Sequence, residues 1–126
     1  MTETPGDGTV ELQIEEVVEV AAGQAVVTVR CLRGPVFLEA GFTRLIPQLP
    51  RAERHSPPPT GPATAIDLKL TKIVRYRELR GLDAVHTALV TLRGPGVEQL
   101  RSATRDFGCQ IVQGTNTARE RRKGNP

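Results

Sequence analysis

Hydrophobic and polar residues alternate along most of the chain from Val10 onward, a pattern typical of strands that bury one face. Leu12 and Ile14, for example, stand between polar neighbours. Glycine, proline and polar residues interrupt the alternation at intervals of about 8–12 residues, as turns do in all-β proteins. The pattern predicts strands over residues 10–20, 25–32, 36–39, 42–46, 66–76, 84–92 and 107–112, with one helical turn inside 97–103.

The alternation shifts by one residue within the first predicted strand, which predicts a β-bulge there. It slips again at Lys72-Ile73-Val74. Short strands of this number and spacing predict an all-β fold, a small closed antiparallel β-barrel of about six strands. Closing the sheet would remove most of its exposed edges.

Three segments in order resemble the second domain of translational GTPases of the elongation factor Tu type. They are Ile14–Val18 (IEEVV), Gln24–Gly34 (QAVVTVRCLRG) and Ala84–Gly94 (AVHTALVTLRG), and Val97–Gly108 then resembles that domain's closing strand. The resemblance covers about residues 11–112 and implies a stand-alone, six-stranded antiparallel barrel. In translation factors this domain helps to hold aminoacyl-tRNA or contacts the ribosome, so the resemblance implies RNA or a translation-related protein as partner.

The chain departs from this family at several glycine positions. Val29 and Val85 stand where the family has glycine, and a branched side chain closes space that a ligand could occupy. No ligand-contacting residue is therefore carried over from the family. The phosphate-binding G-x-x-x-x-G-K-[ST] signature does not occur in the sequence, so we expect no nucleotide hydrolysis.

Composition and the positions of turn-forming residues divide the chain into three parts. We expect residues 1–10 to be a disordered lead-in, 11–112 to form the barrel domain and 113–126 to be a basic disordered tail. Residues 47–65 hold six of the ten prolines and predict a flexible loop, because proline does not fit a central strand. The chain of 126 residues is long enough for one domain.

No apolar run in the sequence is long enough for a membrane-spanning helix, and the first residues do not form an export signal. Two cysteines are too few for a disulfide scaffold, and we expect them to be reduced. These features predict a cytoplasmic protein without a membrane partner.

Charge is unevenly spread along the sequence. Residues 1–20 carry six acids and no base, whereas residues 69–80 carry five bases and one acid. The tail holds four cations and one acid, a balance of +3 that equals the net charge of the whole chain. Acidic and basic strands could lie side by side and neutralise each other. They could instead form a polarised surface that steers an anionic partner.

Two groups of residues are candidates for binding. Tyr76 lies between Arg75 and Arg77, and an aromatic ring between cations can stack on a base while the cations hold phosphates. The alternative is an ordinary strand with Tyr76 inward and both arginines in water. Basic tails bind nucleic acid with little sequence preference, although they also serve as solubilising ends. The candidates are Arg75, Tyr76, Arg77, Arg80, Arg119, Arg121, Arg122 and Lys123.

The sequence shows no catalytic constellation, and we expect no enzyme activity, metal or cofactor. The two histidines, His55 and His86, and the two cysteines, Cys31 and Cys109, have no spacing that indicates a metal site or a nucleophile. Glu15 and Glu16 are adjacent on a predicted strand and so point to opposite faces.

Two functions follow from these features. The first is a non-catalytic binding module for RNA or for a translation-related protein. The second is a small regulatory or inhibitory protein of the immunity or antitoxin type, which would bind another protein. The identity of the partner is not encoded in any motif of the sequence.

Overall fold

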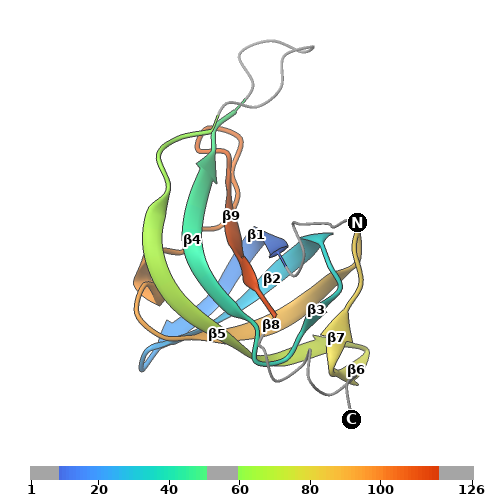
Figure 1. Cartoon of the computed structure of the whole chain (residues 1–126). Helices are drawn as coiled ribbons and strands as arrows, with labels where there is room; N and C mark the ends of the chain where they lie inside the picture. The colour runs from blue at the N-terminus through green and yellow to red at the C-terminus, as the bar shows by residue number, and fades with distance from the viewer. Residues whose placement is uncertain (1–8, 51–59, 117–126) are drawn as a thin grey trace.

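The computed structural model describes residues 9–50 and 60–116, and these form an all-β structure (Figure 1). No α-helix occurs among these residues, so the all-β part of the prediction is confirmed. The elements are β1 (Thr9–Ala21), β2 (Gln24–Arg33), β3 (Val36–Phe37), β4 (Gly41–Gln48), β5 (Thr64–Arg75), β6 (Arg77–Leu79), β7 (Gly81–Leu82), β8 (Thr87–Arg93), the single 3-10 turn η1 (Val97–Gln99) and β9 (Cys109–Thr115).

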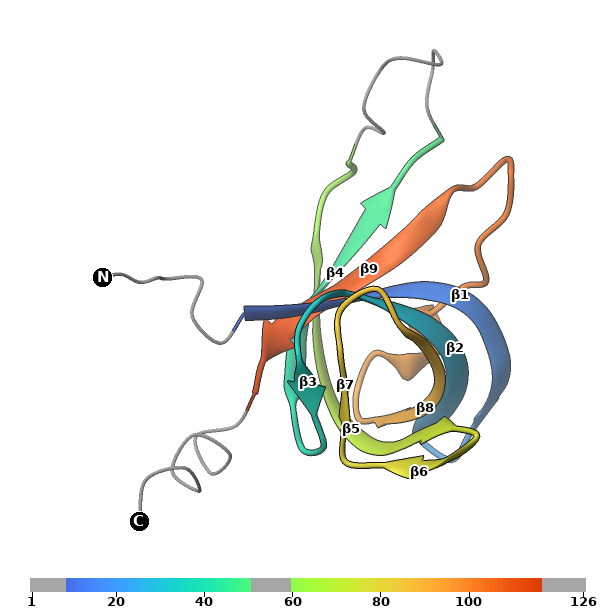
Figure 2. The ribbon, with the colours of Figure 1, turned by 90° about the vertical axis from the view of Figure 1, so that its right-hand side faces the viewer.

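Seven strands form one antiparallel sheet in the order β4-β9-β1-β2-β8-β5-β6, and β3 pairs separately with β7. Strand β4 also pairs with β5, so each of the six longer strands is paired with two others of the six, and β5 pairs with β6 as well. Figure 2 shows β1, β2, β8 and β5 curving around a common interior.

Alternate residues of the longer strands fill that interior, as the sequence pattern predicts. Leu12 and Ile14 on β1, Val29 on β2 and Leu68 on β5 are almost fully buried. Phe42 on β4 is the largest of the fully buried side chains. With no tryptophan in the chain, the core is made largely of leucine, isoleucine and valine.

Both predicted slips in the alternation correspond to irregular pairing. The register of β1 against β2 shifts between Ile14 and Glu16 and again between Val17 and Glu19. The register of β5 against β8 shifts between Leu70 and Lys72. Extra residues at these points let a strand change which face of the sheet its side chains occupy.

The ends of the ordered part differ from the predicted boundaries. Strand β1 begins at Thr9, because Val10 is already buried in the core. Strand β9 extends to Thr115, where it pairs with both Thr9 and Gly41. The lead-in predicted over residues 1–10 therefore ends two residues too late, and the tail predicted over residues 113–126 begins three residues too early.

Three internal predictions also need correction. Pro47 and Gln48 belong to β4 rather than to the proline-rich loop, and the Pro47 carbonyl accepts a hydrogen bond from the Gly61 amide at 2.9 Å. The predicted turn region over 77–83 contains the short strands β6 and β7. The strand predicted over 84–92 begins only at Thr87, because Val85 has a φ of 65° and turns the chain.

The last predicted strand, over 107–112, begins at Cys109. Phe107 is exposed in the preceding turn, so it does not contribute to the core as the alternation suggests. The helical turn predicted inside 97–103 is the 3-10 turn η1, with Val97 and Leu100 buried. These differences all fall at strand ends, where turn geometry outweighs the hydrophobic pattern.

Candidate nucleic-acid interface

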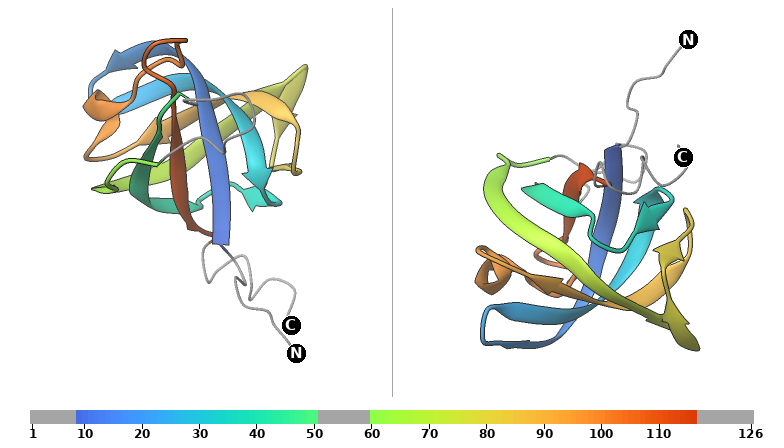
Figure 3. Two further views of the ribbon diagram at one scale, coloured as in Figure 1. Left: turned by 90° about the horizontal axis from the view of Figure 1, so that it is seen from above. Right: turned by 60° about the horizontal axis from the view of Figure 1, so that its bottom comes forward.

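The acidic and basic strands lie on opposite sides of the structure. Strand β1 carries the acids, and β5 carries most of the cations of residues 69–80. Strands β2 and β8 separate β1 from β5 in one direction, and β9 and β4 separate them in the other. The two views of Figure 3 show the β1 side and the β5 side of the structure. The interpretation in which these strands neutralise each other by direct pairing is therefore wrong.

Cations from three strands gather on the β5 side. Two of them, Lys69 and Arg93, come from β5 and β8 and stand directly opposite each other in the ladder. Two others, Arg75 and Arg77, stand opposite each other across the β5–β6 hairpin. We call this set the basic wall: Lys69, Lys72, Arg75, Arg77 and Arg93.

The bulge in β5 places two of these cations on the outer face. Lys69 and Lys72 are three residues apart, so in a regular strand their side chains would point to opposite faces. The register shift between Leu70 and Lys72 corrects this, and both lysines are exposed while Leu70 and Ile73 are buried. On the outer face the basic wall thus extends from Lys69 to Lys72, a length of about 10 Å along the strand. Arg75 follows Lys72 by three residues in regular pairing, so Arg75 and its partner Arg77 lie on the face of Ile73, at the hairpin end of the sheet.

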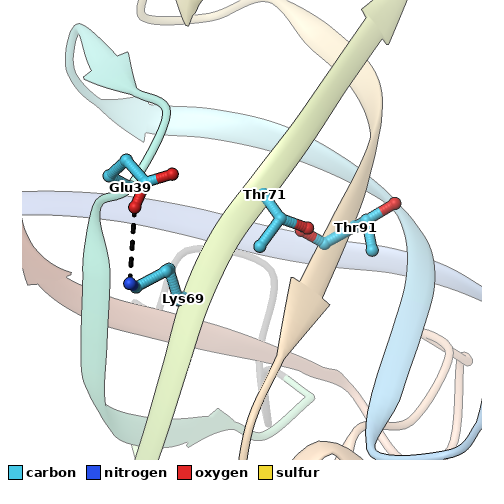
Figure 4. A network of polar contacts seen from close by, with 4 residues as sticks. All are labelled: Glu39, Lys69, Thr71 and Thr91. Carbon is cyan, nitrogen blue, oxygen red and sulfur yellow. Dashed lines mark hydrogen bonds and ion pairs between the residues drawn. The ribbon is translucent and has the colours of Figure 1, made fainter.

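Carboxylates also occur beside the basic wall, since Asp67 precedes Lys69 by two residues on β5 and Glu78 stands opposite Val74 on β6. Within residues 9–50 and 60–116, the one ion pair of the basic wall joins Lys69 Nζ to Glu39 Oε1 at 3.3 Å (Figure 4). Both side chains are about half exposed, so this pair adds little to stability. Beside it, the Thr71 hydroxyl donates a long hydrogen bond of 3.4 Å to the Thr91 carbonyl across the bulge.

Like charges directly opposite each other on neighbouring strands are destabilising. The wall has two such pairs, Lys69–Arg93 and Arg75–Arg77, and the carboxylate of Glu39 forms its ion pair with Lys69. An anion bound over these residues would remove the repulsion. Polyanions such as RNA provide negative charge at regular spacing, which suits a row of cations.

Tyr76 occupies the tip of the β5–β6 hairpin. Its side chain is 98% exposed, and its φ of 77° reverses the chain between Arg75 and Arg77. The Arg75 guanidinium lies 5.6 Å from the centre of the tyrosine ring, within the range of a cation–π contact. The interpretation with Tyr76 pointing inward is therefore wrong, because the strand ends one residue before it.

The remaining predicted binding residues are placed as follows. Arg80 is exposed just after β6, and its carbonyl accepts a hydrogen bond from the Leu38 amide at 3.0 Å. Arg119, Arg121, Arg122 and Lys123 lie outside the described residues. Gly41 pairs with both Lys69 and Thr115, so β9 ends two strands away from the basic wall, at about 10 Å.

Arg93 is the member of the basic wall that sequence reasoning missed. It lies 24 positions after Lys69 in the sequence, and only the pairing of β5 with β8 brings the two together. Lys69 and Lys72 contributed to the charge count, but no sequence signal distinguished them from cations that face other elements. The slip at Lys72 was the one available hint, because it changes the face on which that side chain lies.

The surroundings of the two thiols are those of buried structural residues and not of reactive nucleophiles. Cys31 donates a weak hydrogen bond from Sγ to the Leu82 carbonyl at 3.7 Å, and Cys109 donates one to Gln48 Oε1 at 3.3 Å. Burial raises the pKa of both thiols, so they remain protonated near neutral pH and are weak nucleophiles. Both are free and buried, as expected.

The other chemical candidates contribute no visible site. His55 lies outside the described residues, and His86 lies before β8, where its carbonyl accepts a hydrogen bond from the Cys31 amide at 2.8 Å. Residues 9–50 and 60–116 contain no group of three or more His, Cys, Asp or Glu side chains placed to hold a metal. In the same part of the chain, no helix is long and apolar enough to cross a membrane.

Comparison of the chain with protein-family models, curated proteins and solved structures finds no match. The basic wall and the tip of the β5–β6 hairpin are the features of the described residues that indicate a function.

Proposed function

We propose that the chain is a non-catalytic RNA-binding module that uses the basic wall as its contact surface. The observation that carries this proposal is the register of the sheet, in which Lys69 stands opposite Arg93 and Arg75 opposite Arg77. A fold that needed these cations only for solubility would gain nothing from setting them opposite each other. A phosphate backbone lying over the outer face would neutralise the Lys69–Arg93 pair.

We further propose that the six longer strands form a closed barrel similar to the second domain of translational GTPases. The pairing of β4 with β5 supports this, because it gives every one of these strands two neighbours. In that arrangement the barrel is a rigid support, and Lys69, Lys72 and Arg93 lie on its outer surface. Rigid elements hold binding groups in place better than loops do.

Salt dependence gives the proposal a quantitative expectation. Each phosphate neutralised by a cation releases condensed counterions and contributes about 0.7 to the slope of log affinity against log salt for single-stranded nucleic acid. If the basic wall makes the contacts, removing three of its charges lowers that slope by about 2. A tail-dominated interaction would instead lose its slope when the tail cations are neutralised.

The test measures binding of a labelled RNA hairpin by fluorescence polarisation, at several salt concentrations, with the full chain. The basic-wall variant is Lys69→Gln with Lys72→Gln and Arg93→Gln. A matched control neutralises three exposed acids of β1, Glu15→Gln with Glu16→Gln and Glu19→Gln. A third variant changes Arg119, Arg121, Arg122 and Lys123 to glutamine.

We expect the basic-wall variant to bind at least about tenfold more weakly with a smaller salt slope, while the acid control binds as tightly as the unmodified chain or more tightly. Thermal unfolding of each variant checks that the fold is intact. Equal affinity of the basic-wall variant and the unmodified chain would overturn the site. Absence of RNA binding at low salt would overturn the function and favour a protein partner of the regulatory or inhibitory kind.

A further inference from the structure

The hairpin tip has a feature that the fold itself does not require. Tyr76 adopts a φ of 77°, a conformation that is uncommon for a bulky residue and costs about 1–3 kcal/mol. Glycine adopts this conformation without that cost. Because the Tyr76 side chain is 98% exposed, almost no hydrophobic burial offsets this conformational free energy.

The geometry of the ring is suited to stacking. The Arg75 guanidinium lies 5.6 Å from the ring centre, and the nearly complete exposure of the side chain leaves the ring open to a ligand. Arg77 stands on the other strand of the hairpin, opposite Arg75. A flat aromatic surface with one cation beside it and a second across the hairpin matches a nucleobase whose adjoining phosphates carry negative charge.

We propose that Tyr76 stacks on an unpaired nucleobase. The RNA recognised by the basic wall would then contain a single-stranded segment where it meets the tip of the protein's β5–β6 hairpin. A base inside a duplex is stacked on its neighbours and hides its faces, whereas an unpaired base can lie against an aromatic side chain. This inference rests on the proposed function and adds to it the class of RNA that is bound. In this arrangement Lys69, Lys72 and Arg93 contact the phosphate backbone of the RNA, and Tyr76 contacts a base.

The composition of the chain provides a direct measurement. Tyr76 is the one tyrosine in the sequence, and there is no tryptophan. Intrinsic tyrosine fluorescence therefore reports on this side chain alone. Stacking on a base should quench that emission as unlabelled RNA is added, and free N-acetyltyrosinamide in the same titration corrects for absorption by the bases.

The probes are a single-stranded oligoadenylate, an oligonucleotide of the same length and charge with abasic sites in place of the bases, and an RNA duplex of equal length. The full chain is compared with Tyr76→Ala, with the conservative Tyr76→Phe, and with Phe107→Ala. Phe107 is a matched control, because it is an exposed aromatic residue in a turn outside the basic wall.

We expect Tyr76→Ala to weaken binding of the single strand roughly 5- to 100-fold, the range of one lost stacking contact. Tyr76→Phe and Phe107→Ala should bind like the unmodified chain. None of the three should change binding of the abasic strand, and none should change the salt slope, because none alters a charge. Quenching should occur with the oligoadenylate and not with the abasic strand.

The stacking role would be overturned if Tyr76→Ala bound the single strand as tightly as the unmodified chain does. It would also be overturned if Tyr76→Ala lost as much affinity for the abasic strand as for the oligoadenylate. If the basic-wall variant loses RNA affinity in that case, the proposed function stands and only the inference about unpaired bases fails. If no probe binds at low salt, both fail together. Preference for the duplex over the single strand would also overturn the inference and leave the backbone contacts in place.

Discussion

The acidic side of β1 and the basic wall around β5 differ in how their charges are arranged. On β1, Glu11 stands opposite Arg33 in the ladder and accepts a hydrogen bond from Gln113 Nε2 at 2.8 Å. The acids farther along face uncharged residues, since Glu16 stands opposite Thr28 and Glu19 opposite Val26. No acid in this register faces another acid.

On the basic wall, by contrast, cations face cations. Lys69 stands opposite Arg93 and Arg75 opposite Arg77. Each such pair costs about 0.2–1 kcal/mol relative to neutral residues, and the positive φ of Tyr76 lies between the members of the second pair. The acidic side is thus compatible with the fold by itself, whereas the basic wall carries repulsion that an anionic partner would relieve.

The sharpest way to test this difference is to give the basic wall the arrangement found on β1. Arg93→Glu would place a carboxylate opposite Lys69 and convert repulsion into attraction. We expect thermal stability to rise by roughly 1–4 °C, while RNA affinity falls about tenfold or more through loss of a phosphate contact and addition of a negative charge. Differential scanning fluorimetry and fluorescence polarisation measure the two effects.

Arg105→Glu is the matched control, because it makes the same change of charge in the exposed turn before β9. It should weaken RNA binding much less and should not raise the melting temperature. A fall in stability of Arg93→Glu would contradict the assignment of Lys69–Arg93 as a repulsive pair. A fall in affinity equal to that of the control would show that only net charge matters.

The second test gives β1 the arrangement of the basic wall. Glu11→Lys would place a cation opposite Arg33 and remove the acceptor of the Gln113 hydrogen bond. We expect the free energy of unfolding to fall by about 1 kcal/mol. Denaturant unfolding measures it, with an unchanged slope showing that the folded and unfolded states keep their compactness.

Glu19→Lys is the control for this variant, because residue 19 faces Val26 and would meet no like charge across the ladder. Its effect on the free energy of unfolding should remain within about 0.5 kcal/mol. Equal losses in both variants would mean that the cost comes from the altered net charge of β1. The difference between them isolates the cross-strand pair.

The sequence predicts one part of this comparison well. Alternation along β1 and β5 identifies both strands, and the slip at Lys72 corresponds to the bulge that exposes this lysine beside Lys69. These features are local, because a strand with one buried face must alternate whatever its partners are. The buried positions of the core follow from the same rule.

The sequence does not predict which strands become neighbours. Pairing of β5 with β8 and β4 depends on the whole path of the chain, so neither the Lys69–Arg93 pair nor the separation of β1 from β5 could be predicted from local patterns. The exposed position of Tyr76 could not be predicted for a different reason. The alternation of β5 continues up to it, and only the tight turn between Arg75 and Arg77 places it outside the sheet.

The smallest expected effect concerns the one carboxylate that contacts the basic wall. Glu39→Gln removes the partner of Lys69, an exposed ion pair whose loss should change stability by no more than about 0.5 kcal/mol. The freed lysine should then bind phosphate without competition. We expect RNA affinity to rise about two- to threefold, with a slightly steeper salt slope, measured by fluorescence polarisation.

Glu16→Gln separates this local effect from a change of net charge, because Glu16 is an exposed acid of β1 that stands opposite Thr28 and away from β5. A larger gain for Glu39→Gln than for Glu16→Gln would show that the Lys69–Glu39 pair competes with RNA for the same cation. Equal gains would assign the effect to the general field of the protein. No gain in either variant would remove Lys69 from the contact surface and leave Lys72, Arg75, Arg77 and Arg93 to hold the backbone.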